Sequence, residues 1–105
     1  MSGTSVDAID SALVRCGNDA VVILATHQHA LPLAIKQQIA ALSHSGPDEI
    51  EQAGILDREL GMLFAEATLQ LLATAKMQPE QVRAIGCHGQ TVRHRPDLGW
   101  TIQLN

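Results

Sequence analysis

Two short stretches of this chain gather residues that could do chemistry, and the first is MSGTSVDAID at its start. It places Gly3, Thr4 and Ser5 ahead of Asp7 and Asp10. A glycine allows close backbone approach, successive N–H groups in a tight turn bind anions, and hydroxyls donate to phosphate oxygens. The two aspartates could orient a hydrated Mg²⁺. On this pattern alone the function stays open, because the stretch lacks the lysine of a G-x-x-x-x-G-K-[ST] loop and could be a plain turn bonded to its own backbone.

The second stretch is GCHGQTVRHRP (86–96), in which two glycines bracket Cys87 and His88. We expect it where a strand passes into a loop, the usual place for ligands in α/β sheets. His88, Gln90 and Thr91 offer a mixed donor and acceptor set suited to sugar hydroxyls. The alternative is a half-buried histidine with satisfied hydrogen bonds beside a turn glutamine. Cys87 is best explained as a small apolar packing residue.

A zinc site is a further alternative for the histidines of the chain. His27 and His29 alternate along an expected strand, and Cys87, His88 and His94 cluster near the second stretch. Their spacing matches no C-x-x-C or H-E-x-x-H pattern, so we favour structural or solvated histidines over zinc ligands.

The elements that must position these stretches follow from hydrophobic periodicity. Residues 6–15 alternate as a strand, and 20–29 have the β-branched apolar composition of a second strand. CGND (16–19) between them is a turn signal, which predicts an antiparallel hairpin. Pro32 suits the first turn of a helix whose apolar stripe is formed by Leu33, Ile35, Ile39 and Leu42. SHSGP (43–47) should break this helix.

A longer second helix is predicted to follow, and Asp48 with Glu51 resembles an acidic capping box at its start. The helix should end near Met77. Its buried stripe recurs at three- and four-residue steps and consists of Leu56, Leu60, Phe64, Ala67 and Leu71. VRAIGCHGQTV (82–92) predicts a short buried strand that runs into a glycine-marked loop, and WTIQLN (100–105) predicts a last strand. Together these elements indicate an α/β fold with a mixed sheet.

Composition restricts the classes of function. The 105 residues allow one domain at most, with an aliphatic core because aromatic residues make up only 2%. The net charge of −4 and the lack of a basic cluster argue against nucleic-acid binding. No apolar run reaches the roughly 18 residues of a membrane span, and no secretory leader is recognisable. Two cysteines make no disulfide framework, so we expect a cytoplasmic protein without membrane or nucleic-acid partners.

Taken together, the two stretches are more specific than either alone. MSGTSVDAID, followed some seventy residues later by IGCHGQTVRHRP, resembles the anhydro-N-acetylmuramic acid kinases, whose relatives include levoglucosan kinase. That family carries an MSGTS-x-DG-x-D phosphate loop and an IG-x-HGQT segment followed by H-x-P. The helix LDRELGMLFAEATLQLL (56–72) is similar too, so the resemblance covers the whole chain.

The resemblance implies an actin-like, hexokinase-like (ribonuclease H-like) ATPase fold, of which residues 1–105 would be a partial N-terminal lobe of a two-domain sugar kinase. In the family one more strand precedes the phosphate loop, and that first strand is missing here. A sheet edge would then be exposed beside the hairpin and could lead to self-association. The implied reaction uses ATP and Mg²⁺ to open the 1,6-anhydro bridge of the small-molecule substrate and phosphorylate the freed oxygen, in cell-wall (peptidoglycan) recycling.

The family's site residues carry over position by position. The resemblance assigns ATP and phosphate binding to Gly3, Thr4, Ser5, Val6, Asp7, Ala8, Ile9 and Asp10. Asp7 and Asp10 would hold Mg²⁺ through water, and His88, Gln90 and Thr91 would bind the anhydro-sugar. Ala8 stands where the family usually has glycine, and its methyl group would crowd a backbone that needs φ > 0 or close ligand approach.

The family's general base lies in a later segment with no match here, so the resemblance implies no catalytic residue in this chain and an inactive piece on its own. Two alternatives stay open. One is a levoglucosan-type anhydro-sugar kinase. The other is a non-catalytic, degenerate lobe that acts as a binding or assembly module.

Overall fold

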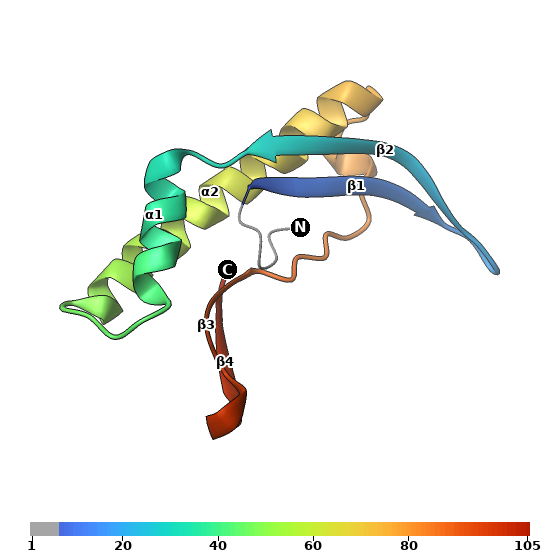
Figure 1. The fold of residues 1–105 in the computed structure, drawn as a ribbon. Helices are drawn as coiled ribbons and strands as arrows, with labels where there is room; N and C mark the ends of the chain where they lie inside the picture. Colours follow the sequence, from blue (N-terminus) through green and yellow to red (C-terminus); the bar gives the residue numbers. More distant parts are fainter. Residues whose placement is uncertain (1–6) are drawn as a thin grey trace.

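Two antiparallel hairpins and two helices make up the computed structural model, which describes residues 7–105 (Figure 1). The first hairpin pairs β1 (Ala8–Cys16) with β2 (Val21–Ala30), in register from Ala8 opposite Ala30 to Cys16 opposite Val21. The Gly17 N–H donates to the Ala20 carbonyl at 2.8 Å and closes the turn. The predicted hairpin is therefore confirmed.

One face of this hairpin is turned toward the helices. Ile9 is buried, and Ser11 and Leu13 are half-buried on the same face, whereas Asp10, Ala12 and Val14 are exposed. The pairing register shifts between Leu13 and Val14. Beyond that bulge the hairpin extends away from the helices, as Figure 1 shows, and large apolar side chains of β2 stay exposed.

The helices are α1 (Leu33–Leu42) and α2 (Glu49–Ala75). Ile35, Ile39 and Leu42 are buried as predicted, but Leu33 is 69% exposed and does not belong to the apolar stripe of α1. The stripe of α2 is confirmed, with Phe64 only partly buried. At 1.5 Å per residue, the 27 residues of α2 span about 40 Å. This helix contacts β1, β2, α1 and β4, so it is the scaffold on which the other elements are placed.

The N-terminal cap of α2 differs from the sequence prediction, whereas the end of the helix near Met77 agrees with it. Asp48 has the left-handed conformation (φ 53°) and makes no capping hydrogen bond with its side chain, because that bond needs an extended N-cap backbone. The predicted capping box is therefore wrong. The helix ends at Ala75, two residues before Met77. Lys76 is left-handed (φ 56°), and the Met77 N–H donates to the Leu72 carbonyl, which is a Schellman motif.

The C-terminal third of the chain shows the largest difference. After a single 3₁₀ turn, η1 (Pro79–Gln81), residues 82–89 form no strand; the strand β3 (Gln90–Arg95) lies where a loop was expected. Ile85 is 71% exposed and the segment has no strand partner within residues 7–105, so its backbone cannot complete a ladder. The predicted strand at 82 is therefore wrong.

A second hairpin closes the chain. β3 pairs antiparallel with β4 (Trp100–Leu104) through η2 (Pro96–Leu98) and the left-handed Gly99. The described part of the chain thus holds two separate two-stranded sheets, and the single mixed sheet that the sequence indicated is not formed. The coarser expectation of an α/β fold is correct.

One core joins these elements. Ile9, Leu31 and Val92 reach it from the hairpins and their flanks, and the rest comes from the helices, namely Ile35, Ile39, Leu42, Leu56, Leu60 and Ala67. Among the helices of residues 7–105, neither is both long and apolar enough to cross a membrane.

Candidate functional site

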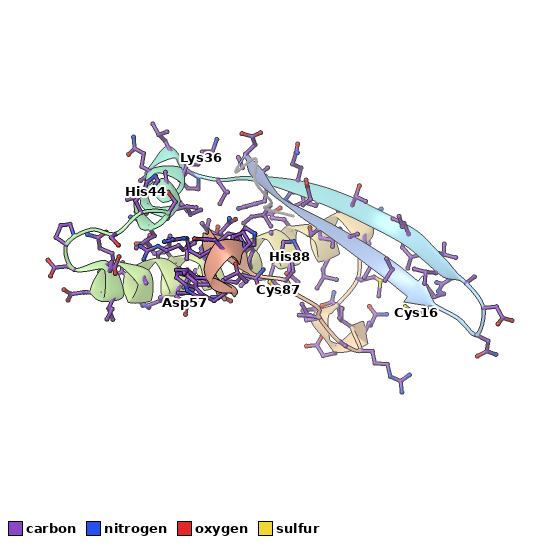
Figure 2. All side chains as sticks on the ribbon, turned by 60° about the horizontal axis from the view of Figure 1, so that its bottom comes forward. Cys16, Lys36, His44, Asp57, Cys87 and His88 are labelled. Atoms are coloured by element: carbon purple, nitrogen blue, oxygen red, sulfur yellow. The ribbon has the colours of Figure 1, made fainter. Side chains whose placement is uncertain are left out.

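A groove of about 980 Å³ runs along β1. One wall is β1 itself, from Ile9 to Cys16, and the other is the extended segment 82–89. Side chains of α2 from Phe64 to Leu72 lie between them. Figure 2 labels Cys87 and His88 on the segment that follows α2, and Cys16 toward the far end of β1. The groove therefore brings the two chemistry-bearing stretches of the sequence together.

The first stretch enters this groove through β1. Gly3, Thr4, Ser5 and Val6 lie outside the described residues, so their phosphate-binding role stays a prediction. Asp7 is exposed at a bend, and Asp10 is exposed and lines the groove.

The two residues between those aspartates have structural positions. Ile9 is 5% exposed and packs in the core, so its contribution to a ligand site would be through the backbone. Ala8 is the first residue of β1 and is absent from the residues with positive φ. The backbone there has no need of glycine's freedom, which removes one of the two objections to alanine at this position.

Of the three residues predicted to bind sugar, His88 lines the groove, together with its neighbours Gly86, Cys87 and Gly89. Its Nδ1 lies 2.8 Å from the Gly89 carbonyl oxygen. Because a carbonyl oxygen only accepts, Nδ1 must carry the proton in this contact, which leaves Nε2 as the acceptor of the neutral ring. An exposed imidazole in that tautomer can accept a hydrogen bond from a hydroxyl group.

Gln90 and Thr91 lie elsewhere, at the start of β3. Gln90 is 1% exposed, its Nε2 donates to the Thr91 carbonyl at 2.9 Å, and its Oε1 is buried without a partner among the described residues. Thr91 is half-buried, and its Oγ1 accepts a hydrogen bond from Gln103 at 3.3 Å. Neither residue lines the groove in this structure. Their predicted role in sugar binding stays a prediction.

Arg93 fixes the hairpin that carries Gln90 and Thr91. Its guanidinium donates to the Leu42 carbonyl (3.0 Å), the His44 carbonyl (2.8 Å) and the Glu49 carboxylate (2.8 Å). The hydrogen bond from Arg93 holds the pKa of Glu49 below its ordinary value. At the tip of the same hairpin, the hydrogen bond from Arg95 lowers the pKa of Asp97. Periodicity could not identify these contacts, because Arg93 and its partners are more than forty residues apart.

The histidines of β2 take part in a different contact. His27 Nε2 lies 3.3 Å from His29 Nδ1, and His29 Nε2 lies 3.5 Å from Glu66 Oε2 on α2. His27 and His29 therefore lie on one face of β2. Within residues 7–105 no three His, Cys, Asp or Glu side chains are grouped closely enough to hold a metal ion, so the zinc alternative gains no support.

Comparison with known proteins gives one consistent result. The sequence pattern of the family described as anhydro-N-acetylmuramic acid kinase matches residues 1–105. The chain is 49% identical over 105 residues to the anhydro-N-acetylmuramic acid kinase of Bordetella pertussis and 49% identical over 106 residues to that of Shewanella halifaxensis. It is 47% identical over 104 residues to that of Pseudomonas putida. These alignments cover 99–100% of this chain but only 28–29% of each relative.

Proposed function

Because the chain belongs to the anhydro-N-acetylmuramic acid kinase family, we propose that it supplies part of the substrate cleft of such a kinase. In its full-length form the protein would convert 1,6-anhydro-N-acetylmuramic acid and ATP to N-acetylmuramic acid 6-phosphate and ADP. A role in peptidoglycan recycling and a cytoplasmic location are parts of the same proposal.

One observation carries the proposal beyond the family match. Asp10 and His88, from stretches 78 positions apart in the sequence, line the same groove. Asp10 belongs to the expected phosphate-binding stretch and His88 to the expected sugar-binding stretch. A groove that holds both is what transfer of a phosphoryl group to a sugar oxygen requires, since catalysis of such a transfer rests on positioning.

The residues of the first stretch fit a nucleotide with its metal. Asp7 and Asp10 are exposed carboxylates at the start of β1, and carboxylate oxygens are the donors that hydrated Mg²⁺ prefers. Gly3 through Val6 would bind the phosphate oxygens of ATP, which supplies the transferred γ-phosphoryl group. Asp7 and Asp10 would orient the waters of the metal.

The residues of the second stretch would bind the sugar. Nε2 of His88 would accept a hydrogen bond from a sugar hydroxyl. Thr91 offers a hydroxyl that already has one partner. The buried Oε1 of Gln90 has no donor among the described residues, a situation that costs about 1–3 kcal/mol and favours a partner supplied by ligand or by further protein.

The reaction balances with these roles. Water adds to C1 of the anhydro-sugar as the bond from C1 to the bridging oxygen breaks, and that oxygen takes the γ-phosphoryl group as ADP leaves. We assign no residue of this chain as the general base for the water. Since a partial lobe cannot enclose both substrates, the 105 residues alone should not turn over.

Phosphate-transfer assays on the full-length protein and on the 105-residue chain test the proposal. With ATP and Mg²⁺, the full-length protein should consume 1,6-anhydro-N-acetylmuramic acid, and the 105-residue chain should not. His88→Ala should impair the full-length protein, with His44→Ala, at an exposed position outside the groove and outside both stretches, as the matched control. Preferred turnover of levoglucosan would assign the alternative kinase, and no turnover of either sugar would favour a binding module.

We further propose that the isolated 105-residue chain self-associates. The edge of β1 away from β2 has no strand neighbour within residues 7–105, and Val14 and Ile85 beside the groove are exposed. Unpaired edges with apolar flanks template pairing with another chain. Light scattering should show species larger than a monomer, and Val14→Lys should reduce them. A monomer at all concentrations would contradict this proposal.

A further inference from the structure

Asn105 follows β4, and two hydrogen bonds hold it against helix α2. The Asn105 backbone N–H donates to Asp57 Oδ1 at 2.6 Å, and its side-chain Nδ2 donates to the Asp57 backbone carbonyl at 2.7 Å. Asn105 has φ 57°, in the left-handed region that asparagine tolerates better than most residues. The backbone N–H and the side-chain amide of Asn105 therefore both bind Asp57 and fix Asn105 on α2.

Gly61, one turn further along α2, leaves room for this contact. A Cβ atom at Gly61 would lie 2.5 Å from Asn105 Nδ2, closer than such contacts allow. Moving Nδ2 away would break its hydrogen bond to Asp57. Gly54 on the same helix has nothing within 4 Å of a Cβ placed there. Glycine in a helix interior is destabilising by roughly 1 kcal/mol relative to alanine, and at Gly61 the structure gives a packing reason for it.

Asn105 also contacts the segment that carries His88. The Cys87 thiol donates to the Asn105 carbonyl at 3.6 Å, and a Cβ at Gly89 (φ 73°) would lie 2.7 Å from the Leu104 carbonyl oxygen. Asn105 is thus enclosed by α2 on one side and by residues 87–89 on the other. Figure 2 labels Asp57 on α2, and Cys87 and His88 on the segment that leads to β3.

We propose that Asp57 and Gly61 are positioning residues that set the place of His88 in the groove through Asn105. This inference rests on the proposed function, in which His88 binds the sugar. Asn105 lines the groove, but Asp57 and Gly61 do not, so they act through Asn105 and not by touching substrate. Neither the sequence motifs nor the family match assigns them a role.

The contact itself is tested by hydrogen exchange on the full-length protein. Gly61→Ala should speed exchange of the amides in residues 86–92 by roughly tenfold, as a local opening does. Gly54→Ala is the matched control and should leave that exchange unchanged. Asn105→Gly removes the side chain that an alanine at position 61 would meet. In the Asn105→Gly background, adding Gly61→Ala should therefore cause little further increase in exchange.

The positioning role is tested by kinetics on the same full-length protein. Asp57→Leu removes both side-chain oxygens and should raise KM for 1,6-anhydro-N-acetylmuramic acid by roughly tenfold while KM for ATP stays unchanged. Asp57→Asn keeps an oxygen at Oδ1 and should restore KM for the sugar. A general loss of folding would shift both KM values or abolish activity, and would not distinguish asparagine from leucine in this way.

The outcomes separate the inference from the function on which it rests. Unchanged exchange in Gly61→Ala would overturn the contact. If exchange changes in Gly61→Ala but KM for the sugar stays unchanged in both Asp57 variants, the positioning role would be overturned. Changed exchange in a protein that phosphorylates no anhydro-sugar would keep the contact, overturn its role in sugar binding, and refute the proposed function.

Discussion

Replacing Arg93 by methionine should loosen the β3–β4 hairpin from the two helices. Methionine keeps most of the aliphatic stem but removes the donors to the Leu42 and His44 carbonyls and to Glu49. The Arg93 side chain is only 17% exposed, so water cannot fully replace these contacts. Leu42 is the last residue of α1, and its carbonyl would also lose a cation at the helix C-terminus.

The magnitude follows from the two hydrogen bonds to carbonyls. A hydrogen bond from a charged donor contributes about 1.5–3 kcal/mol, and these two share one guanidinium, so we expect a loss of about 3 kcal/mol. We assign no free energy of unfolding to the ion pair with Glu49, because its carboxylate is exposed to solvent and screened. Arg93→Lys should lose almost as much, since one ammonium cannot reach both carbonyls in the same geometry.

The assay can use the single tryptophan of the chain. Trp100 lies on β4 opposite Arg95, so its fluorescence reports on the hairpin, while circular dichroism at the helix band reports on α2. In urea, Arg93→Met should shift the Trp100 transition to lower concentration. Arg58→Met, at an exposed position of α2, is the control. Equal transitions for the two variants, or a loss below about 0.5 kcal/mol for Arg93→Met, would refute the reasoning.

Three further predictions concern stability. The hydrogen bond from Arg93 lowers the pKa of Glu49, so the stability that this pair contributes is complete above the ordinary pKa of a glutamate and is lost as the pH falls through the lowered pKa. Urea midpoints measured at falling pH should therefore show a smaller loss of stability in Glu49→Gln than in the unchanged chain. Lys76→Gly should stabilise the chain by about 1 kcal/mol in urea unfolding, because left-handed backbone disfavours a side chain, and a loss would contradict the Schellman geometry. Leu60→Ala should cost about 2–5 kcal/mol through a cavity in the core, whereas exposed Leu69→Ala should cost far less by thermal melting.

The parts of the fold that local pattern controls were predictable. The hairpin at residues 8–30 follows from alternation and a turn signal, and the stripe of α2 follows from three- and four-residue steps. In each case the hydrophobic face and its period lie within one stretch of sequence. The bounds of α2 were predicted too, but its N-terminal capping contact was not, because Asp48 is left-handed and its carboxylate makes no capping hydrogen bond.

The remainder depends on contacts that no local pattern encodes. VRAIG (82–86) has the composition of a buried strand, but a strand needs a neighbour, and within the described residues none pairs with it. Gln90 has the polarity of a loop residue, yet it lies 1% exposed in β3. Asp10 and His88 were predicted as site residues one by one, and only the structure places both on one groove. A glycine inside a strong helical pattern was the available signal for Gly61.

The central position of α2 has a consequence for synthesis on the ribosome. The first hairpin is complete once Ala30 has emerged, but the core in which Ile9 is buried also needs residues of α1 and α2. Another 45 residues, from Leu31 to Ala75, must follow before the second helix is complete. At about 5–20 residues per second, this delay lasts on the order of 2–9 s. During that interval the hairpin is a nascent, uncovered sheet, and a chaperone that shields short apolar strands would have its main opportunity to bind then.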